Sequence, residues 1–367
     1  MKIAFTGGGT GGHIYPGLAI IGALRAVPEF KEADFFWIGS RKGLDKDIVP
    51  GSGIRFFGIH TGKLRRYISL QNISDIFTII AGFIESARIL KKEKPDFLFS
   101  KGGFVSVPPC AAAALLRIPF WTHESDFSAG LATKINSFFA EKICVSYDDT
   151  VRFLPSRLRA KAVLTGNPVR DVFYEASAAR GFEFLGIPPG ERVLLVLGGS
   201  QGAREVNDIV RSSLPRLTAN FTVVHQTGAS TKDDGWNMPE GAFAKEKYIS
   251  MRYIKDEMPD VLACAALVAG RSGAGMVWEC AAAGKPMVLL PLSGSGTRGD
   301  QVENARYFSK KGAALYLLHP SAAEFADAVE NILQSGRLPE MAAASAAVCE
   351  TRPAQTIAAL MSRRFAN

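Results

Sequence analysis

The stretch KIAFTGGGTGGH, residues 2–13, places five glycines and one histidine directly after a short apolar run. A strand, a glycine loop and a helix in this order are typical of a Rossmann-like unit, whose helix N-terminus binds a phosphate. The spacing Gly-x-Gly-x-x-Gly matches the dinucleotide fingerprint, but the next apolar run, residues 34–40, does not end in the acid that would hold a ribose. A nicotinamide cofactor is therefore disfavoured, while a tight turn without a ligand stays open as an interpretation.

The same arrangement recurs in the second half of the chain, at residues 192–204. Short apolar runs alternate with helical patterns throughout, which predicts an α/β protein with parallel, doubly wound sheets. Two such starts favour two Rossmann-like domains, joined near residues 165–168. The runs that we expect to form strands are 2–5, 35–38, 97–100, 120–123, 142–146, 192–197, 222–226, 267–269 and 287–291.

Composition and charge indicate what kind of protein this is and which partners it suits. The 367 residues are 47% hydrophobic and 21% charged, as in globular proteins, and the net charge of +8 suits an anionic partner. Five scattered cysteines show no metal-ligand spacing, which favours a reducing compartment and no structural zinc. We expect no secretory leader and no membrane span.

Three further glycine-rich loops follow expected strands, at residues 101–106, 198–203 and 270–275. None contains GxxxxGK[ST], so a P-loop NTPase is unsupported. Together with residues 7–12 they place glycine loops at the carboxyl ends of strands in both halves. This predicts a phosphate-binding cleft at the switch points of the two sheets.

Eight motifs occur in a characteristic order, and the chain that carries them resembles the MurG family of bacterial glycosyltransferases. They are GGGTGGHIYPGLA (7–19), GKLRRY (62–67), KGGFVSVP (101–108), HESDFSAGLATK (123–134), TGNPVR (165–170), GGSQGAR (198–204), RSGAGMVWECAAAGKP (271–286) and DQVENA (300–305). The resemblance implies a GT-B fold, with two Rossmann-like domains whose parallel sheets face each other across a cleft. It implies an acceptor- and membrane-facing domain at 1–165, a UDP-GlcNAc-binding domain at 166–344, and a C-terminal helix, about 345–367, packing back on the first.

The implied activity is inverting transfer of GlcNAc from UDP-GlcNAc to lipid I, undecaprenyl-pyrophosphoryl-MurNAc-pentapeptide. The product, lipid II, serves peptidoglycan synthesis and hence cell-wall biogenesis, cell shape and cell division. The resemblance implies a peripheral protein on the cytoplasmic side of the plasma (inner) membrane, with anionic lipid and cell-wall synthesis proteins as partners. It implies no metal, no cofactor and no nucleic acid.

The resemblance also implies binding roles for individual residues. Ile254 would read the uracil through its backbone, Glu279 would hold the ribose, and Gln301 would contact the sugar. The diphosphate would be held by Arg170, Ser200, Ala274, Gly275 and Met276. The remaining candidates for binding UDP-GlcNAc are Thr10, Gly11, Gly12, Asp126, Val277 and Trp278. A solvated helix glutamate remains the alternative for Glu279.

His13 is the candidate general base. Inverting transfer needs a base near the acceptor hydroxyl, and a histidine close to a helix N-terminus has its charged form disfavoured. The alternative is a histidine that only hydrogen-bonds within the turn. His123 and Glu124 end another expected strand, and Glu124 is the second catalytic candidate, with a structural role as its alternative.

Several positions depart from the family pattern. Ser125 and Asp126 stand where the family usually has Gln and Asn, and Thr133 stands where it has Asn. Trp278 occupies a position that is normally small, and Asp300 replaces the Gln or His before the sugar-binding glutamine. These departures concern contacts to the sugar and the acceptor and leave the nucleotide framework intact.

Residues 73–90 carry apolar side chains at helical spacing between two basic clusters. A core-facing amphipathic helix and a membrane-docking helix both fit this pattern. The candidates for membrane contact are Ile76, Phe77, Ile79, Ile80 and Phe83, with Arg65 and Arg66 as basic flanks.

Two alternatives to the transferase remain open from the sequence. One is another GT-B enzyme that uses a UDP-sugar, such as an epimerase or a transferase with a different acceptor. The other is a UDP-sugar-binding protein without turnover.

Overall fold

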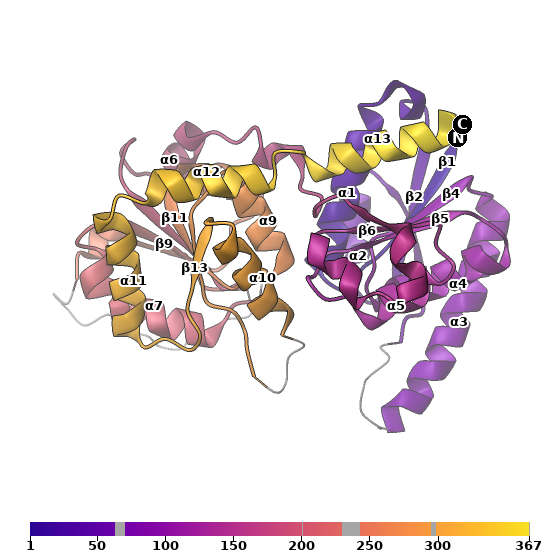
Figure 1. The fold of residues 1–367 in the computed structure, drawn as a ribbon, viewed down its shortest axis with the longest axis horizontal. Helices are drawn as coiled ribbons and strands as arrows, with labels where there is room; N and C mark the ends of the chain where they lie inside the picture. Colours follow the sequence, from indigo (N-terminus) through magenta and orange to yellow (C-terminus); the bar gives the residue numbers. More distant parts are fainter. Residues whose placement is uncertain (63–69, 200, 230–242, 295–298, 367) are drawn as a thin grey trace. The chain divides into compact units, whose positions relative to one another are not determined.

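The computed structural model describes residues 1–62, 70–199, 201–229, 243–294 and 299–366, and within these it leaves the side chains of 70–75 undescribed. The chain divides into two units (Figure 1). Unit 1 comprises residues 1–170 and 351–367, and unit 2 comprises residues 171–350. Each unit is an α/β body built on its own parallel sheet, as the sequence predicted.

The sheet of unit 1 has the strand order β3-β2-β1-β4-β5-β6-β7, and all its pairs are parallel. The order reverses between β1 and β4, where Thr6 pairs with Ser100. This switch point brings the loops that follow the two strands side by side at one edge of the sheet. The strands are β1 (Lys2–Thr6), β2 (Asp34–Ser40), β3 (Arg55–Ile59), β4 (Phe97–Ser100), β5 (Phe120–Glu124), β6 (Lys142–Val145) and β7 (Ala162–Leu164).

Helices cover both faces of this sheet. They are α1 (Gly11–Arg25), α2 (Asp45–Gly51), α3 (Leu70–Glu93), α4 (Val107–Leu115), α5 (Leu131–Ser137) and α13 (Pro353–Ala366). Successive strand residues point to opposite faces, so Ile3 and Phe5 join one buried cluster with α1 and α13. Ala4 joins a second cluster with Leu90 of α3 and Cys110 of α4. Burial on both faces explains why these strands are apolar runs.

The C-terminal helix α13 packs against α1 in unit 1. Phe365 lies edge-on to Phe30 and Phe97, with ring centroids 5.7 Å apart in each pair. Arg364 makes two hydrogen bonds to Glu141, at 2.8 and 3.0 Å. We expected one helix from about residue 345. The structure instead ends one helix, α12, at Val348 in unit 2 and begins α13 at Pro353, because proline is favoured in a first helical turn and not in a helix interior.

The sheet of unit 2 has the order β10-β9-β8-β11-β12-β13, again wholly parallel. Its switch point lies between β8 and β11, where Leu197 pairs with Gly270. The strands are β8 (Val193–Leu197), β9 (Thr222–Gln226), β10 (Tyr248–Met251), β11 (Ala265–Gly270), β12 (Met287–Leu289) and β13 (Ala314–Tyr316). The helices are α6 (Ala178–Leu185), α7 (Arg204–Leu217), α8 (Met258–Cys264), α9 (Ala274–Ala282), α10 (Asp300–Lys310), α11 (Ala322–Gln334) and α12 (Leu338–Val348).

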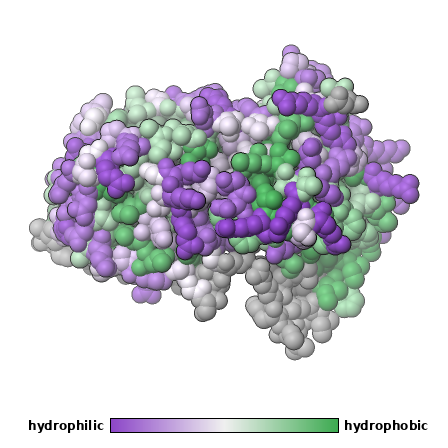
Figure 2. Space-filling view, viewed as in Figure 1, coloured by the Kyte–Doolittle hydropathy of each residue, from purple (hydrophilic) through white to green (hydrophobic). Residues whose placement is uncertain are grey.

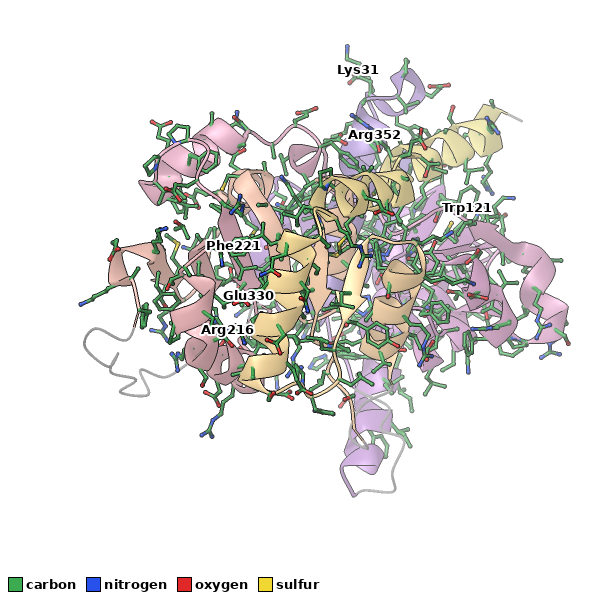
Figure 3. The ribbon with its side chains drawn as sticks, turned by 60° about the vertical axis from the view of Figure 1, so that its left-hand side comes forward. Lys31, Trp121, Arg216, Phe221, Glu330 and Arg352 are labelled. Carbon is green, nitrogen blue, oxygen red and sulfur yellow. The ribbon has the colours of Figure 1, made fainter. Side chains whose placement is uncertain are left out.

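Polar pairs join neighbouring helices on the outside of unit 2. Arg216 of α7 makes two hydrogen bonds to Glu330 of α11, at 3.0 and 2.5 Å, and the two side chains point toward each other in Figure 3. Phe221, after α7, belongs to the buried core of the unit. This contact is structural and lies on helices rather than at the ends of the strands.

No helix in the described residues is long and apolar enough to cross a membrane. All five cysteines are buried as free thiols.

Candidate functional site

The first glycine loop connects β1 to α1 at the switch point of unit 1. Gly9 has φ +86°, a conformation that favours glycine, and Thr10 is the extended N-cap of α1. The His13 amide donates to the Thr10 carbonyl oxygen at 3.1 Å, which begins the helix. Thr10 and Gly12 are exposed, so the start of α1 presents backbone N–H groups to solvent and to any anion there.

Asp45, which was not predicted from the sequence, lies outside this loop in the chain and binds its backbone. Its carboxylate is fully buried and accepts from the Gly9 amide at 3.2 Å and from the Ser40 amide at 2.7 Å. A Cβ on Gly8 or Gly39 would collide with the same carboxylate. Asp45 comes from α2, after β2, so the acid that is absent from the end of β2 occurs five positions later and binds protein backbone.

The second glycine loop, after β4, meets the first at His13. Gly103 has φ +75°, and a Cβ there would lie 2.9 Å from His13 Cδ2 and 3.1 Å from Nε2. The His13 ring therefore rests on a position that only glycine fits. His13 itself is half-buried.

A buried polar cluster lies beside these loops. Lys101, which begins the second loop, donates from Nζ to His123 Nδ1 at 2.9 Å, to Ser125 Oγ, and to Asn167 Oδ1 at 3.3 Å. His123 Nε2 donates to the Gly166 carbonyl oxygen at 2.9 Å. Burial lowers the pKa of Lys101 to about 7, and it also depresses the pKa of His123 well below its usual value. Lys101 was not among the predicted site residues.

Glu124 shapes the loop that follows β5. Its two carboxylate oxygens accept from the Asp126 amide at 3.1 Å and from the Gly130 amide at 2.9 Å. Burial raises its pKa, and the Asp126 charge adds to that effect. Both oxygens thus bind backbone, which is the structural role that the sequence left open beside the catalytic one.

In unit 2 the glycine loop after β8 also contains a glycine with positive φ and leads directly into a helix. Gly199 has φ +88°, and the Gly202 amide donates to its carbonyl oxygen at 3.1 Å just before α7 begins. A Cβ on Gly270 would collide with the Leu197 carbonyl group. The end of β11 therefore lies too close to the backbone of β8 for any residue but glycine at the switch point. Ser200, expected on the diphosphate, lies outside the described residues.

An ion-pair network joins three loops at the same edge of the unit 2 sheet. Arg271 donates to Glu205 Oε2 at 2.7 Å and to the Leu290 carbonyl oxygen at 2.9 Å. His319 Nδ1 lies 3.1 Å from Glu205 Oε1, and its Nε2 lies 2.6 Å from Ser293 Oγ. The hydrogen bond from Arg271 lowers the pKa of Glu205. None of these four side chains was a predicted site residue, because they come from four separate segments, although Arg271 lies in the glycine loop at 270–275.

Two of the predicted nucleotide contacts already bind protein groups. The Ile254 amide donates to Gln226 Oε1 at 2.9 Å, and Ile254 is buried. Gln301 Oε1 accepts from the Leu292 amide at 2.9 Å. The Gln301 carbonyl oxygen accepts from the Ser272 hydroxyl at 2.7 Å, which ties the start of α10 to the loop before α9.

The first turns of α9 separate the predicted residues into two groups. Ala274, Gly275 and Met276 form its N-terminus, where amide groups are available to an anion. Val277 and Trp278 point into the core, and Trp278 packs edge-on against Phe308 at 5.9 Å. Their side chains therefore act in packing. Glu279 is half-buried on the same helix.

Arg170, which we expected to serve the nucleotide domain, ends the first segment of unit 1. Its guanidinium lies 4.7 Å from the centroid of the Tyr15 ring on α1. Within the described residues no group of three or more His, Cys, Asp or Glu side chains is arranged to hold a metal ion.

The predicted membrane residues divide between exposed and half-buried positions on α3. Phe77 is 68% exposed, and Ile76 and Ile80 are each 49% exposed. Ile79 and Phe83 are half-buried, and Phe83 packs against the unit 1 core. Arg65 and Arg66 lie outside the described residues.

Comparison with known proteins gives concordant matches over both units. Residues 3–145 match the glycosyltransferase family 28 N-terminal domain, and residues 193–360 match the C-terminal domain. The UDP-N-acetylglucosamine–N-acetylmuramyl-(pentapeptide) pyrophosphoryl-undecaprenol N-acetylglucosamine transferase of Treponema denticola is 49% identical, over 99% of this chain and 97% of that protein. The protein of the same name from Lachnospira eligens is 43% identical, over 86% of each.

Solved structures agree on the fold. The crystal structure of Acinetobacter baumannii MurG has a TM-score of 0.75 at 23% identity and covers 99% of both chains. The glycotransferase of kitacinnamycin has a TM-score of 0.74 at 14% identity, covering 99% of this chain and 98% of that one.

Proposed function

This chain belongs to the MurG family within glycosyltransferase family 28, and we propose that it transfers N-acetylglucosamine from UDP-GlcNAc to lipid I with inversion, forming lipid II. The observation that carries this proposal is the 49% identity over 99% of the chain to a protein named for that transfer. The glycine loops and helix starts at the switch points of both sheets supply the phosphate-binding chemistry that the reaction requires.

We assign the acceptor to unit 1. Inversion requires the acceptor hydroxyl to attack the anomeric carbon on the face opposite the departing UDP, with a base taking the hydroxyl proton. His13 is the proposed base, because its ring lies on Gly103 between two glycine loops at the switch point. Glu124 is proposed to support this site by holding the loop from Asp126 to Gly130.

UDP-GlcNAc is assigned to unit 2. The diphosphate would lie at the N-terminus of α9, where Ala274, Gly275 and Met276 begin the helix and its dipole favours negative charge. Glu279 would accept from the ribose hydroxyls, and Gln301, already held by Leu292, would offer its amide to the sugar.

The membrane surface is proposed to bind at α3. Phe77, Ile76 and Ile80 are exposed together on its N-terminal half. Figure 2 shows hydrophobic residues gathered on the face where Figure 1 places α3. Lys91 and Lys92, exposed at the other end of this helix, add positive charge that suits anionic lipid. We place the protein on the cytoplasmic side of the plasma membrane, where its lipid-linked acceptor would be reached without a membrane span.

A transfer assay tests the assignment. Radiolabelled UDP-GlcNAc and a short-chain lipid I analogue should yield a product that carries both the label and the lipid. His13→Ala should lower kcat by about 100- to 10,000-fold. His60→Ala, an exposed histidine of the same unit bound to Glu85, is the matched control and should keep activity. Epimerisation without acceptor, or UDP-GlcNAc binding without transfer, would support the two alternatives.

A further inference from the structure

Lys101 is a fully buried lysine that the proposed reaction does not yet use. It follows β4, and its backbone amide donates to the Thr6 carbonyl oxygen at 2.7 Å, which continues the pairing of β4 with β1. The residues after it, Gly102 and Gly103, both have positive φ and turn the chain toward His13. A buried lysine is costly unless its charge is compensated, so its partners indicate what it does there.

The three Nζ contacts account for the three protons of an ammonium group. The Gly166 carbonyl can only accept, so His123 Nε2 carries the ring proton and Nδ1 accepts from Lys101. Ser125 Oγ and Asn167 Oδ1 accept the other two. A neutral amine has only two protons, so its lone pair would have to accept from the Ser125 hydroxyl, and the hydrogen bonds of the cluster would lose their charge assistance.

The contacts join segments that are far apart in the sequence. His123 and Ser125 lie at the end of β5, and Asn167 lies in the loop after β7. Lys101 itself belongs to the turn that carries Gly103, on which the His13 ring rests. The ammonium therefore links that turn to two other loops at the same edge of the sheet.

The titratable groups around Lys101 come from three neighbouring segments. Glu124 of β5 and Asp126 after it favour the charged lysine, whereas burial raises the pKa of Cys144 of β6 to about 12, so that thiol is neutral where Lys101 titrates. His123 contacts it directly, and a charge on His13 would lower the pKa of His123. Burial outweighs the favourable charges and lowers the pKa of Lys101 to about 7.

We propose that Lys101 is a positioning residue for the transfer reaction: its charged ammonium holds the Gly102–Gly103 turn, and through it the His13 ring, in the productive position. The proposal rests on the assignment of His13 as the base in unit 1. When Lys101 loses its proton, its hydrogen bonds lose their charge assistance and the turn is held less firmly. Activity therefore declines as pH rises through the pKa of Lys101.

Lys101→Met tests the proposal, because Met has similar length and no charge. We expect kcat to fall about 10- to 100-fold, since small displacements of a catalytic group have effects of that size. The KM for UDP-GlcNAc should stay within about 2-fold of the wild-type value, and the alkaline decline should disappear from the pH profile. Thermal unfolding of each variant shows whether it is folded at the assay temperature.

Ser125→Ala provides a milder variant. Removing one acceptor disfavours the charged lysine, so the alkaline decline should move to lower pH while the enzyme stays folded. Ser146→Ala is the matched control, because its buried hydroxyl donates to the Glu124 carbonyl oxygen and does not contact Lys101. The decline should not move in that variant.

An active wild-type enzyme whose pH profile and kcat are unchanged by Lys101→Met would overturn the positioning role alone. So would a Ser125→Ala profile that matches Ser146→Ala. Absence of transfer by the wild-type protein would overturn the proposed function, and the role of Lys101 with it.

Discussion

The Gly9 amide donates to Asp45 Oδ1 at 3.2 Å, so a carboxylate at the start of α2 holds the first glycine loop in place. The same carboxylate binds the Ser40 amide at the end of β2. The loop is therefore a rigid part of the sheet edge, although five of its six residues are glycine. Rigidity of this kind lets backbone N–H groups be aimed at a ligand before it arrives.

Asp45→Ala should cost stability and activity together. It leaves the buried Ser40 amide and the half-buried Gly9 amide without their acceptor, and an unsatisfied buried group costs about 1–3 kcal/mol. Urea unfolding and the transfer assay should both detect the change. Asp47→Ala, an exposed acid on the same helix, should change neither. Full activity in Asp45→Ala would show that the loop keeps its shape without this carboxylate.

Gly103→Ala should impair transfer through His13. A methyl group at this position would lie 2.9 Å from the His13 ring, so the ring must move. We expect kcat to fall about 100-fold for a shift near 1 Å. Gly186→Ala is the control, because Gly186 also has positive φ, +66°, but nothing lies within 4 Å of its Cβ position. Both variants bear backbone strain, and an equal loss of activity in both would refute a specific effect on His13.

Arg271→Ala should weaken UDP binding by unit 2. Arg271 is 13% exposed and holds both Glu205 and the Leu290 carbonyl group at the sheet edge. Its loss frees the loops around the start of α9, so we expect the Kd for UDP to rise about 10-fold, a change of about 1.4 kcal/mol. Isothermal titration measures this directly. Arg216→Ala, which breaks the exposed pair with Glu330, should leave the Kd unchanged and cost about 1 kcal/mol of stability or less.

Phe77→Glu should reduce binding to anionic vesicles in a sedimentation assay. Phe77 is 68% exposed, more than any other membrane candidate that the structure describes, whereas Ile79 is half-buried, so Glu at Ile79 would also disturb packing. We expect transfer to a short-chain soluble acceptor to persist, because the change lies on the outside of α3. Leu318→Glu, at a similarly exposed apolar residue of unit 2, is the control. Equal vesicle binding by wild type and Phe77→Glu would exclude this surface.

The sequence predicted the central strands of both sheets and missed the edges. Within the described residues every expected strand is present, and the four that were not expected are β3, β7, β10 and β13. Each of these lies at the edge of its sheet. An edge strand has a neighbour on one side only and is partly exposed, so it needs no continuous apolar run. Hydrophobic periodicity cannot detect such strands.

The sequence by itself determined the α/β class, the two glycine-loop units and the position of His13. These follow from local patterns, because a strand, a glycine turn and a helix N-terminus are contiguous in the chain. Only the tertiary structure showed that Asp45 binds the Gly9 loop, that Gly103 supports His13, and that Lys101 joins His123, Ser125 and Asn167. Parallel strands bring distant loops together at one edge of a sheet, and the contacts made there depend on strand order, which the residues in each loop do not encode locally.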